Sequence, residues 1–426
     1  MLKLIFLLLV FCGFELYPQS AEYAGKIINT LSSEEYKGRG YCGKADLLSA
    51  EFIGNEYRNL GIHALTKNYF QYFNLNVNTF PDVMEVKLKD HFLTPGINYL
   101  VDPSSSSLKG HFKILRISKS DLLIPEKLNT FLTSSEGKAL LIDLTDSTKL
   151  TKEEEETSQN IINTIKYDPR LKNRLTLLFS EKKLTWGVSD WNCRKAIIII
   201  NSVGLDMEEF SEIDVSIKAT FLKQYRTQNV VGMIKGRTVP DSFLVITAHY
   251  DHLGMMGKKT IFPGANDNAS GVAMLLNICN YFSKNPPEYS MLFIAFSAEE
   301  AGLKGSKYFV DHPLIPTGNI KFLINFDLAG TGQEGIKVVN ASVFKTEFEK
   351  LKQINSTHNY LSSIQARGEA CNSDHCFFYQ LKVPCFYIYT LGGIAAYHDV
   401  FDKNETLPLI EFEDYYKLML AFLKSF

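Results

Sequence analysis

Short apolar runs alternate with longer amphipathic runs from Asn229 to the end of the chain. The apolar runs have the length of buried strands and lie at Val230–Ile234, Phe243–Thr247, Met291–Phe296, Phe322–Phe326 and Val383–Tyr389. Runs with helical spacing separate them at Gly271–Phe282, Gly302–Val310 and Phe344–Gln353. Strands that alternate with helices are typical of an α/β fold, so we predict a mixed, largely parallel sheet with helices on both faces.

The first half of the chain has a different pattern. Apolar residues recur at helical spacing over Ala21–Leu31 and Lys44–Leu60, and Gly61 ends the second run. Over residues 76–226 short apolar runs are separated by polar stretches, and runs such as Ala139–Leu144 and Ala196–Ile200 predict strands. This block shows no convergence of metal-binding or nucleophilic residues. We expect it to form a smaller inserted domain, α+β or β-rich.

The N-terminus carries one charge followed by an apolar run. Lys3 precedes Leu4–Phe11, which is too short to cross a bilayer and is typical of a secretory signal. We therefore predict that residues 1–20 are a signal peptide and that the mature protein is secreted or periplasmic. A lipid anchor at Cys12 is the only membrane attachment left open. In an oxidising compartment, Cys371 and Cys376 are the one pair close enough in sequence to suggest a local disulfide.

The composition is that of an ordinary globular protein. Of 426 residues, 45% are hydrophobic and 22% are charged, and this composition differs from that of disordered proteins. Lys and Arg number 45 and Asp and Glu number 47, so the net charge is −2. A balanced charge lacks the basic footprint of a nucleic-acid-binding protein. We therefore expect no nucleic-acid partner and look for function in a local site.

Potential metal ligands follow the predicted strands at the points where the strands end. The strands at 243–247, 291–296, 322–326 and 383–389 are followed by His249, by the pair Glu299 and Glu300, by Asp327 and by His398. Asp267 lies just before the helix predicted at 271–282. Ligands of open α/β sheets bind outside the carboxyl ends of the strands, so we expect these side chains to meet.

The residue types at these positions point to zinc. Imidazole and carboxylate ligands without a thiolate suit zinc at a catalytic site, and they also suit cobalt or manganese. Two histidines and three carboxylates exceed the three protein ligands of a usual catalytic zinc, but they suit two ions bridged by one carboxylate. Each residue alone could be a hydrogen-bonded loop residue or a helix cap. Their occurrence at successive strand ends favours a site for two zinc ions.

Other candidate residues are set aside. His252 is expected to point away from His249, because residues three apart in a strand lie on opposite faces. His312, His358 and His375 are also left out of the metal site. The chain has no Gly-x-Ser-x-Gly nucleophile elbow and no phosphate-binding loop.

Five motifs occur in order along this part of the chain. They are Thr247–Asp251, Pro263–Gly271, Ser297–Ser306, Asn325–Asp327 and Tyr397–Asp399. Together they resemble the signatures of the di-zinc aminopeptidase and glutamate carboxypeptidase family, which includes the bacterial leucyl aminopeptidase-like zinc exopeptidases. Leu31–Arg39 resembles the first segment of that family, and Ser373–His375 resembles a loop that borders its active site.

The resemblance implies a ligand set and an organisation of the chain. Asp267 would bridge both zinc ions, His249 and Asp327 would complete one site, and Glu300 and His398 would complete the other. The zinc-exopeptidase-like fold would then be split. Residues 21–75 would form the N-terminal part of the catalytic domain and residues 227–426 the remainder, with the domain 76–226 inserted between them.

The resemblance also implies catalytic roles. Glu299 would be the general acid/base, taking a proton from a metal-bridged water and returning it to the leaving amine. Asp251 would be the neighbouring carboxylate that fixes the tautomer of the His249 imidazole. These roles describe hydrolysis of a peptide bond.

The function expected is that of a secreted di-zinc metallo-exopeptidase acting on peptide or protein substrates, and most typically an aminopeptidase. A carboxypeptidase or dipeptidase is an alternative, with Arg367 as a candidate for binding a free carboxylate. A second alternative is a transferase that resembles glutaminyl cyclases, which use a single zinc. A binding module that has lost its ligands is disfavoured, because all five ligands and Glu299 are present. The sequence does not specify the oligomeric state.

Overall fold

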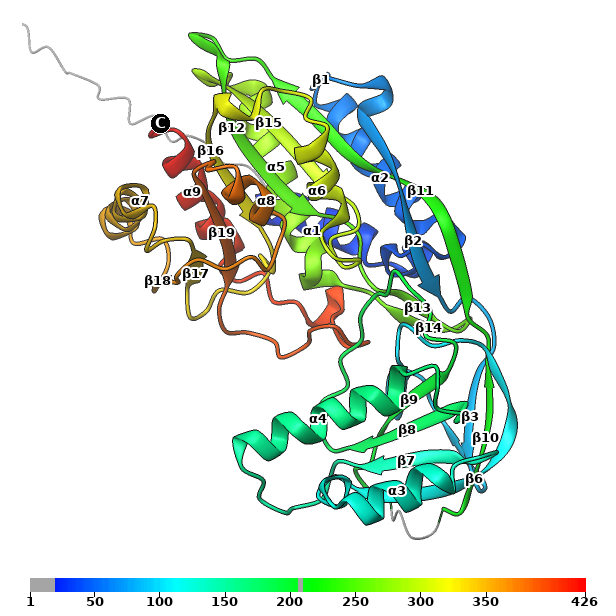
Figure 1. Cartoon of the computed structure of the whole chain (residues 1–426). Helices are drawn as coiled ribbons and strands as arrows, with labels where there is room; N and C mark the ends of the chain where they lie inside the picture. Colours follow the sequence, from blue (N-terminus) through cyan, green and yellow to red (C-terminus); the bar gives the residue numbers. More distant parts are fainter. Residues whose placement is uncertain (1–19, 206–209) are drawn as a thin grey trace, which may run out of the picture.

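The computed structural model describes residues 20–205 and 210–426, and Figure 1 shows two lobes, each built around one sheet. Apart from Ser20, the predicted signal peptide lies outside the described residues, as does Cys12. Two long strands, β2 (Phe70–Thr79) and β11 (Thr220–Ile234), extend between the larger and the smaller lobe (Figure 1). The chain therefore passes between the lobes along paired strands.

The larger lobe contains a nine-stranded sheet. Its strands lie in the order β1 (His63–Ala64), β11, β15 (Tyr289–Phe296), β12 (Val239–His249), β16 (Ile320–Phe326), β19 (Cys385–Thr390), β17 (Ile336–Val339) and β18 (Ile364–Ala366), with β2 paired to β11. The four central strands β15, β12, β16 and β19 run parallel, whereas β11 is antiparallel to β15 and β17 is antiparallel to β19. The predicted mixed, largely parallel sheet is confirmed.

Helices cover both faces of this sheet, as predicted. One face packs against α1 (Ser20–Leu31), α2 (Ala45–Asn59), α5 (Gly271–Lys284) and α9 (Phe412–Leu423), with α7 (Lys345–His358) beside α9. The other face packs against α6 (Lys304–Asp311) and α8 (His375–Gln380). Alternation along β12 explains this, because Leu244 and Ile246 face the first group while Val245 faces the second. The parallel strands are thereby buried on both sides.

The smaller lobe is an α+β body. Its eight-stranded sheet has the order β4 (His91–Leu93), β3 (Met84–Leu88), β10 (Glu212–Ile217), β6 (Leu108–Ser118), β7 (Ala139–Asp143), β8 (Leu175–Ser180), β9 (Ala196–Asn201) and β5 (Tyr99–Val101). Two helices, α3 (Pro125–Thr133) and α4 (Lys152–Tyr167), cover one face through Phe131 and Ile162.

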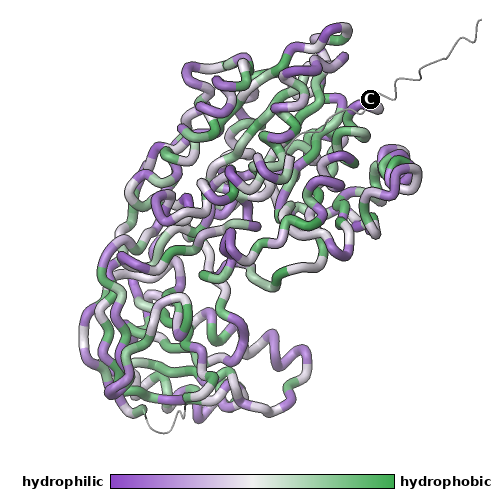
Figure 2. The backbone as a smooth tube through the Cα atoms, turned by 180° about the vertical axis from the view of Figure 1, so that it is seen from behind, coloured by the Kyte–Doolittle hydropathy of each residue, from purple (hydrophilic) through white to green (hydrophobic). Residues whose placement is uncertain are grey.

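The other face of the small sheet packs against the larger lobe. The contact is a hairpin of the larger lobe, formed by β13 (Gly254–Met256) and β14 (Thr260–Phe262). The rings of Trp186 and Phe262 lie 4.6 Å apart, and both residues belong to one apolar cluster with strands of the small sheet. Figure 2 shows the same division, with hydrophobic segments through both lobes and hydrophilic turns outside. The apolar cluster therefore holds the lobes together.

None of the helices within residues 20–205 and 210–426 combines the length and the apolar character needed to cross a membrane. The predicted local disulfide is confirmed, because Cys371, in the segment that precedes α8, is bonded to Cys376 in the first turn of α8. The other four cysteines of the described chain are buried thiols, namely Cys42, Cys193, Cys279 and Cys385.

Candidate metal centre

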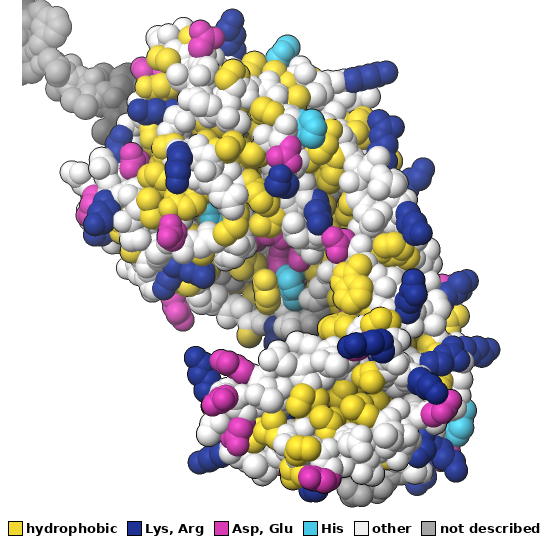
Figure 3. All heavy atoms as spheres, viewed as in Figure 1, with side chains coloured by type: hydrophobic (Ala, Val, Ile, Leu, Met, Phe, Trp, Pro, Cys, Tyr) yellow, Lys and Arg dark blue, Asp and Glu magenta, His cyan; other side chains and the backbone are white. Residues whose placement is uncertain are grey.

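The predicted site residues meet at the carboxyl ends of the parallel strands. His249 is the last residue of β12, and Asp327 directly follows β16. Glu299 and Glu300 occupy the turn after β15. Figure 3 shows a hollow between the lobes with acidic and histidine side chains on its floor. The fold therefore brings these residues to one place, as expected for an α/β sheet.

Asp267 lies between two pairs of ligands. Its Oδ1 is 3.5 Å from His249 Nε2, and that nitrogen is also 3.5 Å from Asp327 Oδ1. Its Oδ2 is 3.0 Å from His398 Nε2, which is 3.3 Å from Glu300 Oε2. The two oxygens of one carboxylate thus face two different histidine–carboxylate pairs. A carboxylate that bridges two cations has this arrangement.

The ligand atoms are close enough for shared coordination. They form two groups, His249 with Glu299 and Asp327, and His252 with Asp267 and Glu300, and the atoms within each group lie within 4.8 Å of one another. Asp327 Oδ1 is buried and has no hydrogen-bond partner in the structure. Buried carboxylate oxygens normally have partners. An unpartnered oxygen 3.5 Å from the His249 imidazole is a donor suited to a cation.

Burial and crowding shift the pKa values of these groups. Burial raises the pKa of Glu299 well above its usual value, and the charge of Asp374 adds to this although His249 opposes it. Burial likewise raises the pKa of Asp251 to about 7. For His398 burial acts downward, but its two carboxylate neighbours raise the pKa to about 11. A divalent cation would relieve this crowding, because it stabilises ionised carboxylates and neutral imidazoles.

Asp251 lies beside His249, as predicted, but its contacts differ from those expected. The Nδ1 atom of His249 is 3.1 Å from the backbone oxygen of Asp251 and 3.8 Å from its carboxylate Oδ1. The carboxylate instead accepts hydrogen bonds from the backbone N–H groups of Glu299, at 3.1 Å, and Glu300, at 3.3 Å. The backbone carbonyl therefore orients the imidazole, and the carboxylate holds the turn that carries both glutamates.

The expectation that His252 points away from the site is wrong. Strand β12 ends at His249, so the alternation of a strand does not extend to His252. The side chain is buried, and its Nδ1 lies 2.8 Å from Glu300 Oε1. His252 therefore contacts a candidate ligand. Its position as the second histidine of His-Tyr-Asp-His was the only signal in the sequence.

The turn that carries Asp267, Ala265–Ser270, is held by two charged side chains that sequence reasoning did not single out. Asp402 accepts hydrogen bonds from the backbone N–H groups of Asn266 and Asp267, at 2.8 and 2.9 Å. Arg39 is fully buried and donates to five backbone carbonyls at 2.7 to 3.0 Å, those of Leu31, Tyr250, Pro263, Gly264 and Asp267. The backbone around Asp267 is therefore fixed from both sides.

The backbone at Gly264 requires a glycine at this position of the motif Pro263–Gly271. Its φ is +61°, which favours glycine, and a Cβ there would lie 2.1 Å from the carbonyl oxygen of Asp267. The Arg39 guanidinium would also be only 2.6 Å away. A larger residue would displace the carbonyl that Arg39 binds.

The disulfide-bonded segment borders the site, as the resemblance implied. Asp374 is buried, neither of its carboxylate oxygens has a hydrogen-bond partner among the residues that the structure describes, and burial raises its pKa to about 7. His375 stacks on Tyr387, with ring centroids 5.1 Å apart. The hydroxyl of Tyr387 lies 3.3 Å from Asp327 Oδ2. This segment therefore packs against the ligand shell rather than contributing a predicted ligand.

The remaining candidates lie elsewhere. Arg367 is exposed and donates to the hydroxyl of Tyr389 at 3.2 Å. His312 and His358 are exposed, and their rings stack on Tyr308 and Tyr360. The structure thus brings together the seven predicted site residues and leaves these three outside.

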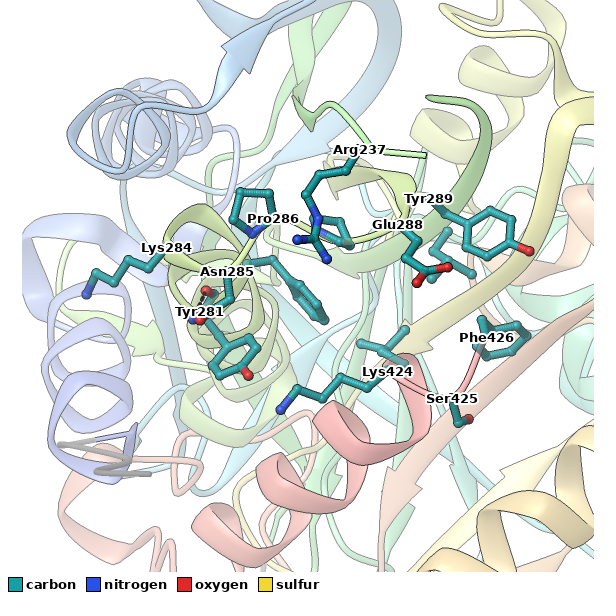
Figure 4. Close-up of a pocket in the computed structure, with 14 residues that line it drawn as sticks. Arg237, Tyr281, Lys284, Asn285, Pro286, Glu288, Tyr289, Lys424, Ser425 and Phe426 are labelled. Atoms are coloured by element: carbon teal, nitrogen blue, oxygen red, sulfur yellow. Dashed lines mark hydrogen bonds between the residues drawn. The ribbon is translucent and has the colours of Figure 1, made fainter. Parts of the chain in front are cut away.

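A separate pocket of about 720 Å³ lies at the opposite end of the sheet. It is lined by the segment between β11 and β12, the start of β15 and the last residues of the chain, as Figure 4 shows for Arg237, Tyr289 and Phe426. Its ionisable lining includes Arg237, Lys284 and Glu288 but no histidine. Because the ligands lie at the carboxyl ends of the strands, this pocket takes no part in the metal centre.

Comparison with known proteins shows that part of the chain is similar to peptidases. Residues 229–423 match the model of peptidase family M28. Aminopeptidase YwaD of Bacillus subtilis is 34% identical over 140 residues, which are 31% of this chain and 29% of that protein. The alignment thus covers less than a third of the length of this curated relative.

Solved structures share the fold of the whole chain. BSAP, a zinc aminopeptidase from Bacillus subtilis, has a TM-score of 0.69 at 19% identity, covering 96% of this chain and 95% of its own. A peptidase M28 precursor from Shewanella amazonensis SB2B has a TM-score of 0.70 at 16% identity, covering 96% and 94%. The family model spans every candidate ligand from His249 to His398. The part of the chain that carries the candidate ligands, residues 229–423, is therefore similar to peptidase family M28.

Proposed function

We propose that this protein is a secreted zinc exopeptidase with a two-ion centre, and that it acts as an aminopeptidase. The observation that carries this proposal is the placement of Asp267, whose two oxygens face two separate histidine–carboxylate pairs. The secreted location rests on the apolar run Leu4–Phe11, and sequencing the N-terminus of the mature protein checks it, since a chain still beginning at Met1 contradicts it.

The donor set fits two zinc ions. His249 and Asp327 would hold one ion, Glu300 and His398 would hold the other, and Asp267 would contact both. Nitrogen and oxygen donors without thiolate are those of catalytic zinc sites, and they admit cobalt or manganese. When bound, the ions supply Lewis acidity, which lowers the pKa of a coordinated water and polarises a substrate carbonyl.

Glu299 is the general acid/base of this proposal. Its backbone N–H is held by the Asp251 carboxylate, and its side chain offers an oxygen within 4.8 Å of ligand atoms of His249 and Asp327. From there the carboxylate takes the proton of the attacking water and returns it to the amine that leaves. Burial, which raises the pKa of Glu299, favours a group that holds the proton between these two steps.

The charge of the site supports recognition of a free amine. The carboxylates of the site, Asp251, Asp267, Glu299, Glu300, Asp327 and Asp374, outnumber the positive charges that two divalent ions would bring, and the four aspartates among them are buried. Such a surplus favours an ammonium group and disfavours a free carboxylate. Arg367, the candidate for binding a carboxylate, is instead hydrogen-bonded to Tyr389. The name of the curated relative, an aminopeptidase, supports the same direction.

Mass spectrometry of peptides incubated with the zinc-loaded protein tests the direction of attack. Each peptide is supplied in two forms, with a free and with an acetylated N-terminus, and each reaction is repeated with a chelator. We expect stepwise loss of N-terminal residues from the free form only, abolished by the chelator. Loss from C-termini would replace the aminopeptidase by a carboxypeptidase. Loss of ammonia from N-terminal Gln without cleavage would favour a cyclase-like transferase.

A further inference from the structure

The loop that carries His398 has little regular structure to hold it. It connects β19 with the short turn Asn404–Thr406, and residues 391–403 form neither helix nor strand. Within it, Gly392, Gly393 and His398 all have positive φ. Segments without ladder hydrogen bonds open more easily than strands or helices. The position of the His398 imidazole therefore depends on partners outside the loop.

A segment of the smaller lobe supplies the partners nearest to His398. Residues 181–191, here called the strap, connect β8 with the segment before β9. The backbone N–H of Trp186 donates to the His398 carbonyl at 2.9 Å, and His398 Nδ1 lies 2.9 Å from the Trp186 carbonyl. Because the carbonyl can only accept, Nδ1 carries a proton, so the neutral imidazole that binds a metal would offer the lone pair of Nε2 on the side of Asp267. The strap thus sets both the position and the tautomer of the imidazole.

Lys183 of the strap binds the same loop at three points. Its Nζ donates to the carbonyls of Ala395, at 2.6 Å, and Tyr397, at 3.2 Å. It also lies 2.7 Å from a carboxylate oxygen of Asp399, a side chain that is only 5% exposed. Asp399 in turn accepts from the backbone N–H of Phe401 at 2.8 Å. One ammonium group therefore ties together the residues on both sides of His398.

The strap is itself firmly anchored. The Trp186 indole N–H donates to the Val101 carbonyl of β5 at 2.8 Å, and its ring is buried against Phe80 and Phe262. Buried aromatic rings contribute strongly to packing. The strap can therefore hold the loop that carries His398 in a fixed position relative to the smaller lobe.

The two proposed ion sites differ in which lobe orients their histidine. His249 is oriented by the backbone carbonyl of Asp251, which belongs to the larger lobe. His398 is oriented by Trp186, which belongs to the smaller lobe. Groups that orient a ligand imidazole change metal affinity when they are removed. A change in the strap should therefore affect one ion site and spare the other.

We propose that the smaller lobe completes one of the two ion sites, and that Lys183 is the positioning residue through which the strap holds the His398 loop in its metal-binding form. This inference rests on the proposed two-ion centre. It gives the smaller lobe a role in the metal centre, although its sequence shows no convergence of metal-binding residues.

The test is a calorimetric titration of the metal-free full chain with Zn²⁺, comparing wild type with Lys183→Ala. We expect the Kd of one ion to rise about tenfold in the variant while the other stays within about twofold. Lys182→Ala removes an exposed lysine next to it and should leave both affinities unchanged. Lys183→Arg keeps a cation that can reach the same oxygens and should restore most of the lost affinity. Thermal unfolding of the metal-free forms is recorded alongside.

The outcomes separate this inference from the proposed function. Two ions bound by wild type with both affinities unchanged in Lys183→Ala overturn the inference and leave the proposed function in place. An equal loss at both sites together with a lower Tm of the metal-free variant also overturns it, because Lys183 then supports only the fold. A wild type that binds one ion contradicts the two-ion centre, and the inference fails with it.

Discussion

Replacing Glu299 with alanine is expected to lower kcat by about 10³-fold while the protein keeps its full complement of zinc. The side chain lies among ligand atoms of the site, yet the proposed coordination uses Glu300 and not Glu299. Removing it takes away the group that moves the proton but none of the five ligands. Steady-state kinetics with a free-amine peptide and elemental analysis of the same sample check both parts of the expectation.

Two further variants accompany Glu299→Ala. Glu299→Gln keeps the shape of the side chain but cannot accept the proton, so it should lose as much activity as the alanine variant. Glu288→Gln removes a carboxylate at the pocket on the opposite end of the sheet and should be fully active. Unchanged turnover in Glu299→Ala would remove this residue from the mechanism, and loss of zinc would make it a ligand instead.

Replacing Arg39 with methionine is expected to lower the free energy of unfolding of the metal-free protein by about 3–5 kcal/mol. The guanidinium is fully buried and donates to five backbone carbonyls, which would all lose this partner in the methionine variant. It also carries a positive charge next to Asp267 and Asp402, whose carboxylates would lose a favourable partner. Urea denaturation of the metal-free forms measures the change.

Two further variants, one at Arg39 and one at an exposed arginine, make this test specific. Arg39→Lys has too few donors, in the wrong geometry, to replace a planar guanidinium at five carbonyls, so it should also be destabilised. Arg58→Ala changes an exposed arginine of α2 and should shift the free energy of unfolding by no more than about 0.5 kcal/mol. An Arg39→Met protein as stable as wild type would show that the carbonyls find other partners.

The sequence pattern was sufficient to predict the central strands of the larger sheet, because each of them is a local apolar run. Apolar runs such as Met291–Phe296 became central strands, and ligands placed after them met because parallel strands end at one edge. The family model covers the segment from which these predictions came. The same rule could not place His252, because the strand ends at His249 and the chain turns.

The residues that sequence reasoning missed act across long separations in the chain. Arg39 binds the carbonyl of Asp267, and Trp186 binds His398, although neither residue type signals a metal centre. Hydrogen bonds of this kind depend on how distant segments of the chain pack together. The hydrophobic pattern within one segment does not predict that packing. The contact of Asp251 with the glutamate turn was hidden for the same reason.

The number of zinc ions needed to restore peptidase activity to the metal-free protein tests the two-ion centre most directly. Metal-free protein is titrated with Zn²⁺, and hydrolysis of a peptide with a free N-terminus is followed at each addition. The placement of Asp267 between two histidine–carboxylate pairs predicts that activity rises until two ions per chain are present. Full activity at one ion per chain, or activity that survives complete removal of metal, would contradict it.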